Sequence, residues 1–270
     1  MLVNDKVGLV LSGGGFRGLA QLGVIKYMRE LGLDVDLISG TSAGAIFGSL
    51  IANGYEPDEI LEFCKKEKFF SYSNISIKNG GFFSSDILER LIKKYIPHDD
   101  FDALQMPFYA TATDLTNGRA LTFDQGSLSF AIKASSCFPL VFQPVPYGDV
   151  YLCDGGLMDN FPIGPLKSSC RYFIGVNVNP INVKEGKFGY KDLISRIIRI
   201  ATSSMKNFDT SACDIYIEPD NINNFTTFDT HKLDEIFQLG YVCAQKFELD
   251  FKKIMADKQT IVIIPPQPNK

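Results

Sequence analysis

The sequence predicts an α/β fold of the three-layer α/β/α type, with a mostly parallel central sheet. In the N-terminal part, short apolar runs alternate with longer segments whose apolar residues have helical spacing. This alternation is typical of parallel sheets, because parallel strands need long crossover connections, which are usually helices. The chain has 270 residues, 45% of them hydrophobic. It can therefore form a large core, and we expect one domain spanning residues 1–270.

The first four elements are expected in the order strand, helix, strand, helix. Val7–Leu11 is rich in Val and Leu and precedes a glycine turn, which indicates a buried strand. Arg17–Leu31 has apolar residues three and four positions apart, and Gly32 ends this helix. Val35–Ser39 is the second expected strand, and Ala43–Ala52, rich in Ala, Ile and Leu, is the second helix.

The rest of the chain continues this pattern less regularly. Asp86–Tyr95 is an expected helix, because Ser84 or Ser85 can cap its start and Pro97 follows its end. Phe69–Ser85 has no periodic pattern and predicts a loop, whose rings either plug the core or form a lid. The further expected elements are the strands Phe108–Asp114, Ala120–Phe123, Tyr172–Val178 and Asp214–Ile217 and the helices Tyr190–Met205 and Leu233–Phe251.

Charge and hydropathy argue against several classes of protein. The formal net charge is -4, and basic residues form only short runs mixed with acids, so no nucleic acid partner is expected. No apolar run approaches the ~20 residues that a membrane span needs. The first ten residues lack the pattern of a signal peptide. We therefore expect a cytoplasmic protein that contacts membranes, if at all, from their surface.

The cysteines predict neither a metal site nor a disulfide framework. None of them forms a C-x-x-C pair, and several lie within apolar runs, as expected for small buried residues in a reducing compartment. No metal ion or other cofactor is expected. The six are Cys64, Cys137, Cys153, Cys170, Cys213 and Cys243.

A G-x-S-x-G motif lies between the second expected strand and the second expected helix. Its residues are Gly40, Thr41, Ser42, Ala43 and Gly44. A serine at a sharp strand-to-helix turn projects its Oγ from the sheet edge, and crowding there requires glycine on both sides. The following helix start supplies partial positive charge for an oxyanion. Ser42 is therefore the candidate nucleophile, although the same pattern also occurs as a tight turn with a helix cap.

A glycine-rich loop follows the first expected strand. Consecutive glycines leave backbone amides bare, so the loop can form an oxyanion hole. Its spacing also satisfies the dinucleotide-binding G-x-G-x-x-G, with Asp36 as the ribose-binding acid. However, that acid belongs at the end of the second strand, which Gly40–Gly44 occupies. The loop consists of Gly13, Gly14, Gly15, Phe16, Arg17 and Gly18.

The base for a serine nucleophile has three candidates. The chain has two histidines, His98 and His231, and either could act in an α/β-hydrolase whose triad runs Ser, acid, His. Asp154 is the third candidate, because it directly follows an apolar strand-like run and precedes Gly155 and Gly156. Chemistry alone favours none of them, since Asp-Gly is a common turn pair and each histidine is better explained as a solvated surface residue.

Together these motifs resemble the patatin-like phospholipase family. The resemblance covers roughly residues 5–180, and residues 181–270 are expected to complete the same domain. It rests on G-G-G-x-R-G at Gly13–Gly18, G-x-S-x-G at Gly40–Gly44, D-G-G at Asp154–Gly156, and similar stretches at Thr113–Gly118, Ala134–Pro139, Phe142–Val145, Asn160 and Pro162.

The resemblance implies a lipid acyl hydrolase with a Ser–Asp dyad and neither a catalytic histidine nor a metal. Ser42 is then the nucleophile, Asp154 the base, and the amides around Gly14, Gly15 and Phe16 the oxyanion donors. Arg17 shapes the loop and adds positive field. Burial is expected to raise the pKa of Asp154 and so strengthen it as a base.

Three alternatives remain beside this hypothesis. The first is an esterase that uses a Ser-His-Asp triad with His231. The second is a nucleotide-binding module built on Gly13–Gly18. The third is a non-catalytic binder on the same fold, against which the presence of both Ser42 and Asp154 argues.

Overall fold

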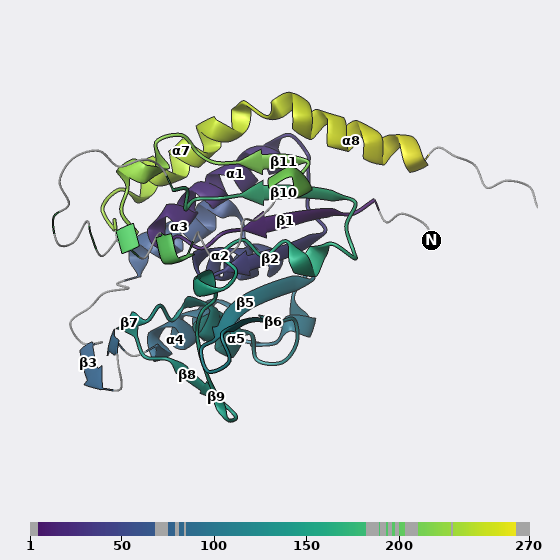
Figure 1. Cartoon of the computed structure of the whole chain (residues 1–270). Coiled ribbons are helices and arrows are strands. Elements are labelled where there is room, and N and C mark those ends of the chain that lie inside the picture. The colour runs from purple at the N-terminus through teal and green to yellow at the C-terminus, as the bar shows by residue number, and fades with distance from the viewer. Residues whose placement is uncertain are drawn as a thin grey trace, which may run out of the picture.

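The computed structural model describes residues 5–67, 75–78, 81–83, 85–181, 189, 193, 196–197, 200–202, 210–227 and 229–262 (Figure 1). Their centre is an eight-stranded sheet. Its strands lie in the order β11 (Ile215–Ile217), β10 (Tyr172–Val176), β1 (Val7–Leu11), β2 (Leu37–Thr41), β5 (Phe108–Asp114), β9 (Val150–Asp154) and β8 (Val145–Tyr147), and β6 (Arg119–Phe123) pairs with β5.

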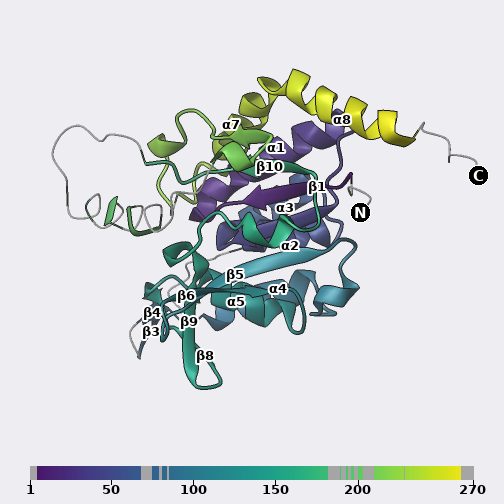
Figure 2. The ribbon, with the colours of Figure 1, turned by 45° about the vertical axis from the view of Figure 1, so that its right-hand side comes forward.

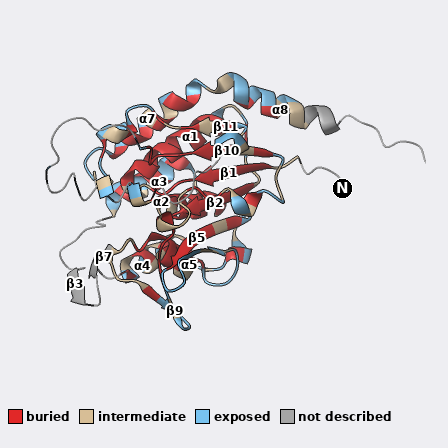
Figure 3. Ribbon diagram, in the orientation of Figure 1, coloured by how far each residue is buried: buried red, intermediate tan, exposed pale blue. Residues whose placement is uncertain are grey.

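The sheet is mostly parallel, as predicted. The five strands from β11 to β5 run parallel to their neighbours, whereas β6 and β9 are antiparallel to β5, and β8 is antiparallel to β9. Every residue of β1 and β2 is buried (Figure 3). Strands covered on both faces need apolar or small residues at every position, which explains the unbroken apolar run of β1.

Helices cover one face of the sheet. Leu9 and Leu11 of β1 point to this face and belong to one apolar core with the buried sides of the helices. Val10 points to the other face, where Phe161 and Leu166 from the segment around two short 3-10 helices cover it. The helices of the first core are α1 (Leu19–Glu30), α2 (Ala43–Ala52), α3 (Pro57–Lys66), α4 (Asp86–Tyr95), α5 (Leu128–Ser136), α7 (Leu233–Gln245) and α8 (Glu248–Val262).

The C-terminal helices pack on the N-terminal half of the chain (Figure 2). Helices α1 and α7 approach so closely that a Cβ added at Gly240 would lie 1.8 Å from the carbonyl oxygen of Ala20. A Cβ added at Gly23 would lie 2.1 Å from the carbonyl oxygen of Phe237. The two glycines therefore let the helix backbones touch, and residues far apart in the sequence share one core.

Short elements complete the structure. A second sheet consists of β3 (Ile75–Lys78), β4 (Gly81–Phe83) and β7 (Leu140–Phe142). No helix among the described residues is long and apolar enough to cross a membrane. The 3-10 helices are η1 (Gly15–Gly18), η3 (Phe101–Ala103), η4 (Gly155–Leu157), η5 (Gly164–Leu166), η6 (Thr210–Ala212) and η7 (Ile222–Asn224).

Several predicted boundaries need correction. The second strand lies two residues later than Val35–Ser39, and the start of the expected helix Arg17–Leu31 belongs to η1, before α1 begins. Leu233–Phe251 divides between α7 and α8, and the strand expected to end at Val178 ends at Val176.

The structure also adds elements within and beyond the expected ones. The expected loop Phe69–Ser85 includes the strands β3 and β4, and its other residues, apart from Ser85, lie outside the described part. Most of Tyr190–Met205 also lies outside it, although its described residues are helical. Helices α3 and α5 were not expected.

Candidate active site

Ser42 sits at a sharp turn between β2 and α2. Its φ is 53° and its ψ is -118°, a conformation that costs a non-glycine residue about 1–3 kcal/mol. A Cβ added at Gly40 would lie 2.3 Å from the carbonyl oxygen of Gly44, and one at Gly44 would lie 2.3 Å from that of Leu11. The crowding expected around the G-x-S-x-G serine is therefore present, and both glycines are required by it.

Strand β5 brings Ser42 and Asp154 together. One edge of β5 pairs with β6, so β2 and β9 share the other edge. Along it, β2 ends with Thr41 opposite Thr111, and the antiparallel β9 ends with Asp154 opposite the next residue, Ala112. Two strand ends thus meet head to head, and the residues at their tips become neighbours although they are far apart in the sequence.

The two side chains form a direct hydrogen bond. The Ser42 hydroxyl donates to Oδ2 of Asp154 at 2.6 Å, and the backbone amide of Gly156 donates to Oδ1 at 2.8 Å. Asp154 is 4% exposed. Its burial raises the pKa to about 6, against the opposing effect of the two hydrogen bonds. The carboxyl group is thus a stronger base than an exposed aspartate and already touches the hydroxyl.

The Asp-Gly-Gly sequence is explained by close packing around this carboxyl group. A Cβ added at Gly155 would lie 2.0 Å from the carbonyl oxygen of Thr111. At Gly156 an added Cβ would lie 3.0 Å from Oδ1 of Asp154 itself. Side chains at these positions would push β9 away from β5 or displace the carboxylate.

The glycine-rich loop lies beside the nucleophile. A Cβ added at Gly13 would lie 3.1 Å from the Cβ of Ser42. The Gly13 amide donates to the carbonyl oxygen of Asn160 at 3.2 Å, and that of Phe16 donates to Thr227 at 3.0 Å. Within the described residues, the amides of Gly14 and Gly15 have no acceptor. These two amides are therefore the ones in the loop available to an anion, whereas the amide of Phe16, also expected as a donor, is engaged.

Arg17 and Gly18 support the loop from behind. The Arg17 side chain is 1% exposed; its Nε donates to the carbonyl oxygen of Gly14 at 3.4 Å, and its guanidinium also bonds to the side chain of Asn179. A Cβ added at Gly18 would lie 2.7 Å from the ring of Phe47 in α2. Arg17 thus holds the loop shape, and Gly18 lets the loop pack on α2.

Replacing Gly14 with alanine is expected to lower kcat by about 10²–10³-fold, the usual cost of losing one oxyanion donor. The added Cβ would lie 2.7 Å from a methyl group of Val178, so the loop must shift and turn its amides. Steady-state hydrolysis of a soluble ester measures this loss. Gly164→Ala is the matched control, because a Cβ there meets nothing within 4 Å. A Gly14→Ala enzyme with the kcat of the parent would exclude this loop as the oxyanion site.

The two histidines lie apart from this hydrogen bond. Both are exposed, and the ring of His98 bonds to the side chain of Asn53 at 2.9 Å. Both carboxyl oxygens of Asp154 are engaged, by Ser42 and Gly156. No histidine therefore stands between the serine and the acid, as the triad alternative with His231 would require.

The dinucleotide alternative also lacks its ribose-binding acid. Asp36 precedes β2, at the opposite end of the strand from the Gly40–Gly44 turn. Its carboxylate accepts hydrogen bonds from the Val7 amide at 2.7 Å and from Lys258 at 3.1 Å. This carboxylate holds the start of the sheet together and does not face the glycine loop.

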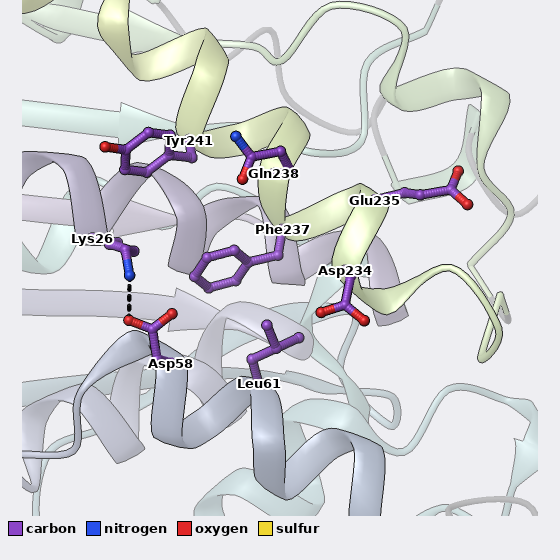
Figure 4. Close-up of a pocket in the computed structure, with 8 residues that line it drawn as sticks. All are labelled: Lys26, Asp58, Leu61, Asp234, Glu235, Phe237, Gln238 and Tyr241. Carbon is purple, nitrogen blue, oxygen red and sulfur yellow. Dashed lines mark hydrogen bonds and ion pairs between the residues drawn. The ribbon is translucent and has the colours of Figure 1, made fainter.

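A surface pocket lies elsewhere, between α1, α3 and α7 (Figure 4). Charged side chains line it, including the ion pair of Lys26 and Asp58 at 2.5 Å. None of its lining residues belongs to the Ser42 turn, the Asp154 turn or the glycine loop. Within the described part of the chain, no cluster of three or more His, Cys, Asp or Glu could hold a metal ion.

Sequence reasoning missed residues that hold the site together. The carbonyl oxygen of Asp159 accepts from the Thr41 hydroxyl at 2.8 Å, next to the Asn160 carbonyl that holds Gly13. Ser135 and Ser136 bond to the backbone of Ser42. In the sequence, Ala134–Pro139 was noted only as part of the family resemblance, and no spacing rule predicts its contact with Ser42.

The fold and the site define an α/β protein with an elbow serine against a buried aspartate. A profile of the family described as "Patatin-like phospholipase" matches residues 9–167. The chain belongs to the patatin-like phospholipase family.

Two relatives illustrate what the chain is similar to in sequence, and one solved structure has a similar fold. The chain is 27% identical to "Lysophospholipase NTE1" of Meyerozyma guilliermondii over 93% of its own length, and it spans 20% of that protein. It is 30% identical to an uncharacterised NTE family protein of Mycobacterium bovis, covering 77% of this chain and 59% of the relative. VipD from Legionella pneumophila has a similar fold, with a TM-score of 0.52 and 16% identity over 92% of this chain and 67% of VipD.

Proposed function

We propose that the protein is a serine lipid acyl hydrolase of the phospholipase A or lysophospholipase type. The observation that carries the proposal is the 2.6 Å hydrogen bond from the Ser42 hydroxyl to the buried carboxylate of Asp154. That distance suits direct proton transfer from a nucleophile to its base. Membership of the patatin-like phospholipase family supports a lipid substrate.

The reaction proceeds in two halves. Asp154 takes the proton of Ser42 while the serine oxygen attacks the ester carbonyl, and the Gly14 and Gly15 amides stabilise the oxyanion. The start of α2, directly after Ser42, adds partial positive charge. The alcohol leaves with the proton from Asp154, and an acyl-enzyme remains. Water then gives a proton to Asp154 and attacks the acyl-enzyme, which releases the fatty acid and restores Ser42.

The pH dependence of kcat/KM is expected to report Asp154. The base acts only when it is ionised, and its pKa is raised to about 6. Activity should therefore rise as pH increases through about 6 and level off above it. Initial rates on a soluble ester between about pH 4 and pH 8 measure this limb.

A histidine base would titrate in a similar range, so the His98→Ala and His231→Ala variants serve as controls. The acidic limb should persist in both. A limb near the ordinary aspartate value of about 4, or one that disappears with either histidine, would contradict Asp154 as the base.

The substrate class can be tested with a panel of lipids. The name of the Meyerozyma relative makes a lysophospholipid the first choice. Purified protein should be assayed for fatty acid release from lysophosphatidylcholine, phosphatidylcholine vesicles and p-nitrophenyl esters, with Ser42→Ala as the blank. We expect release above the blank from at least one lipid. Release that never exceeds the blank would reject a lipid acyl hydrolase.

We also propose that residues 1–270 form one domain. The close packing of α7 on α1 at Gly240 and Ala20 supports this proposal, because residues from both ends of the chain then belong to one apolar core. Limited proteolysis that yields two stable halves would argue against it.

A further inference from the structure

The C-terminal end of α5 touches the main chain of both Ser42 and Asp154. The Ser135 hydroxyl accepts a hydrogen bond from the Ser42 amide at 2.9 Å. The Ser136 hydroxyl donates to the Ser42 carbonyl oxygen at 3.2 Å. The carbonyl oxygen of Cys137 accepts from the Asp154 amide at 3.1 Å. Three consecutive residues therefore hold the backbones of the two residues that the proposed reaction pairs.

Ser42 needs such support because its backbone is strained. Its φ of 53° is unfavourable for any residue with a Cβ, and such conformations persist only where the surroundings enforce them. Ser42 is the residue before α2, so its amide has no acceptor within the helix and needs another one. The Ser135 hydroxyl is that acceptor, and the residue is fully buried, so water cannot take its place.

Ser135 also ties α5 to the sheet. While it accepts from Ser42, its hydroxyl donates to the carbonyl oxygen of Thr111 on β5 at 2.6 Å. Thr111 lies opposite Thr41, the residue before the nucleophile, and the next residue of β5 lies opposite Asp154. The Ser135 hydroxyl thus links Ser42 to β5, the strand that also pairs with Asp154.

We propose that residues 135–137 form a template that sets the distance between Ser42 and Asp154, with Ser135 as its central positioning residue. The inference rests on the proposed function, since it concerns the same dyad. Ser135 takes no part in proton transfer, because its one proton is committed to Thr111 and its side chain does not reach solvent. Its effect is on the geometry of the attack.

The test compares three serine-to-alanine variants of α5. Ser135→Ala should lower kcat for a soluble ester by about 10²-fold, the cost of displacing a reacting group by roughly 1 Å. KM should stay within about two-fold, because the substrate site is untouched. Ser136→Ala should lose less, since the Ser42 carbonyl also accepts from the amides of Ala45 and Ile46.

Ser129→Ala is the matched control. Ser129 lies on the same helix, is equally buried, and its hydroxyl bonds to Asp99 at 3.0 Å, away from the site. Its melting temperature should fall, because a buried hydroxyl loses its place, while its kcat remains that of the parent. A loss of kcat in proportion to the loss of melting temperature in both variants would reduce Ser135 to a stabilising residue and overturn the proposal.

A crystal structure of Ser135→Ala separates this inference from the proposed function. We expect Ser42 to leave its positive-φ conformation and its hydroxyl to move away from Asp154. If the parent protein hydrolyses no ester, the proposed function fails, but this structure still decides the template. A Ser135→Ala structure with Ser42 and Asp154 unmoved would overturn the template, whether or not the parent is active.

Discussion

Replacing Ser42 with alanine is expected to lower kcat by about 10⁶-fold, as in other serine hydrolases that lose the nucleophile. The change removes one oxygen and with it the atom that attacks the ester. The turn itself should survive, because its shape depends on Gly40 and Gly44 and on the backbone bonds of residue 42. Hydrolysis of a soluble ester measures the loss.

The fold of the Ser42→Ala variant is checked by circular dichroism and melting temperature. Alanine has less freedom than glycine at positive φ, just as serine has, so stability should change little. A folded variant that keeps most of its activity would mean that another residue is the nucleophile.

Asp154→Asn is expected to lower kcat nearly as far as Ser42→Ala. Asparagine keeps the size of the side chain but cannot take the proton of Ser42. In a triad the acid only orients a histidine, whereas in the proposed dyad Asp154, at 2.6 Å from the Ser42 hydroxyl, is itself the base. Steady-state rates of Asp154→Asn, His98→Ala and His231→Ala on one soluble ester test the difference. Both histidine variants should keep most of the activity.

Asp154→Asn is not expected to lower the free energy of unfolding at neutral or alkaline pH. Because burial raises the folded-state pKa of Asp154 from 3.8 to about 6, ionised Asp154 disfavours the folded state above pH 6, by about 3 kcal/mol at most. This cost is absent below about pH 4. The variant should thus be at least as stable as the parent at pH 8.

The activity of the histidine variants has its own contrary outcome. A folded His231→Ala enzyme as inactive as Ser42→Ala would replace the dyad by a triad.

The sequence predicted the elements whose patterns are strictly local. Val7–Leu11 and Ala43–Ala52 have the predicted bounds, because one is an unbroken apolar run before a glycine turn and the other follows the G-x-S-x-G turn directly. Leu233–Phe251 was expected as one helix, since its apolar spacing continues through the break at Lys246 and Phe247 between α7 and α8. Hydrophobic periodicity alone does not detect such a break.

The two unexpected helices, α3 and α5, differ in how clearly their sequences signal a helix. Helix α3 has Pro57 at its first turn and a capping box formed by Glu56 and Glu59, so a search for start signals would have found it. Helix α5 is capped by Ser127, but its remaining serines resemble a loop. In the structure the hydroxyls of Ser129 and Ser135 bond to Asp99 and Thr111, which are far from them in the sequence.

The sequence predicted which residues belong to the candidate site but not how they are arranged in space. Motifs and their order pointed to Ser42, Asp154 and the glycine loop. The pairing of β9 on the same edge of β5 as β2 depends on long-range strand register, which no local pattern encodes. The loop amides also differ in a way that no motif predicts. The amides of Gly13 and Phe16 are engaged because Asn160 and Thr227 lie beside them, whereas Gly14 and Gly15 have no acceptor among the described residues.

The most direct test of the Ser42–Asp154 dyad is covalent labelling with a fluorophosphonate probe, followed by peptide mass spectrometry. We expect one adduct, on Ser42, because its hydroxyl donates to the buried carboxylate of Asp154 and the glycine-rich loop lies beside it. Asp154→Asn should react far more slowly, and His231→Ala at the rate of the parent. An adduct on a different serine, or labelling of Ser42 that is indifferent to Asp154→Asn, would contradict the dyad.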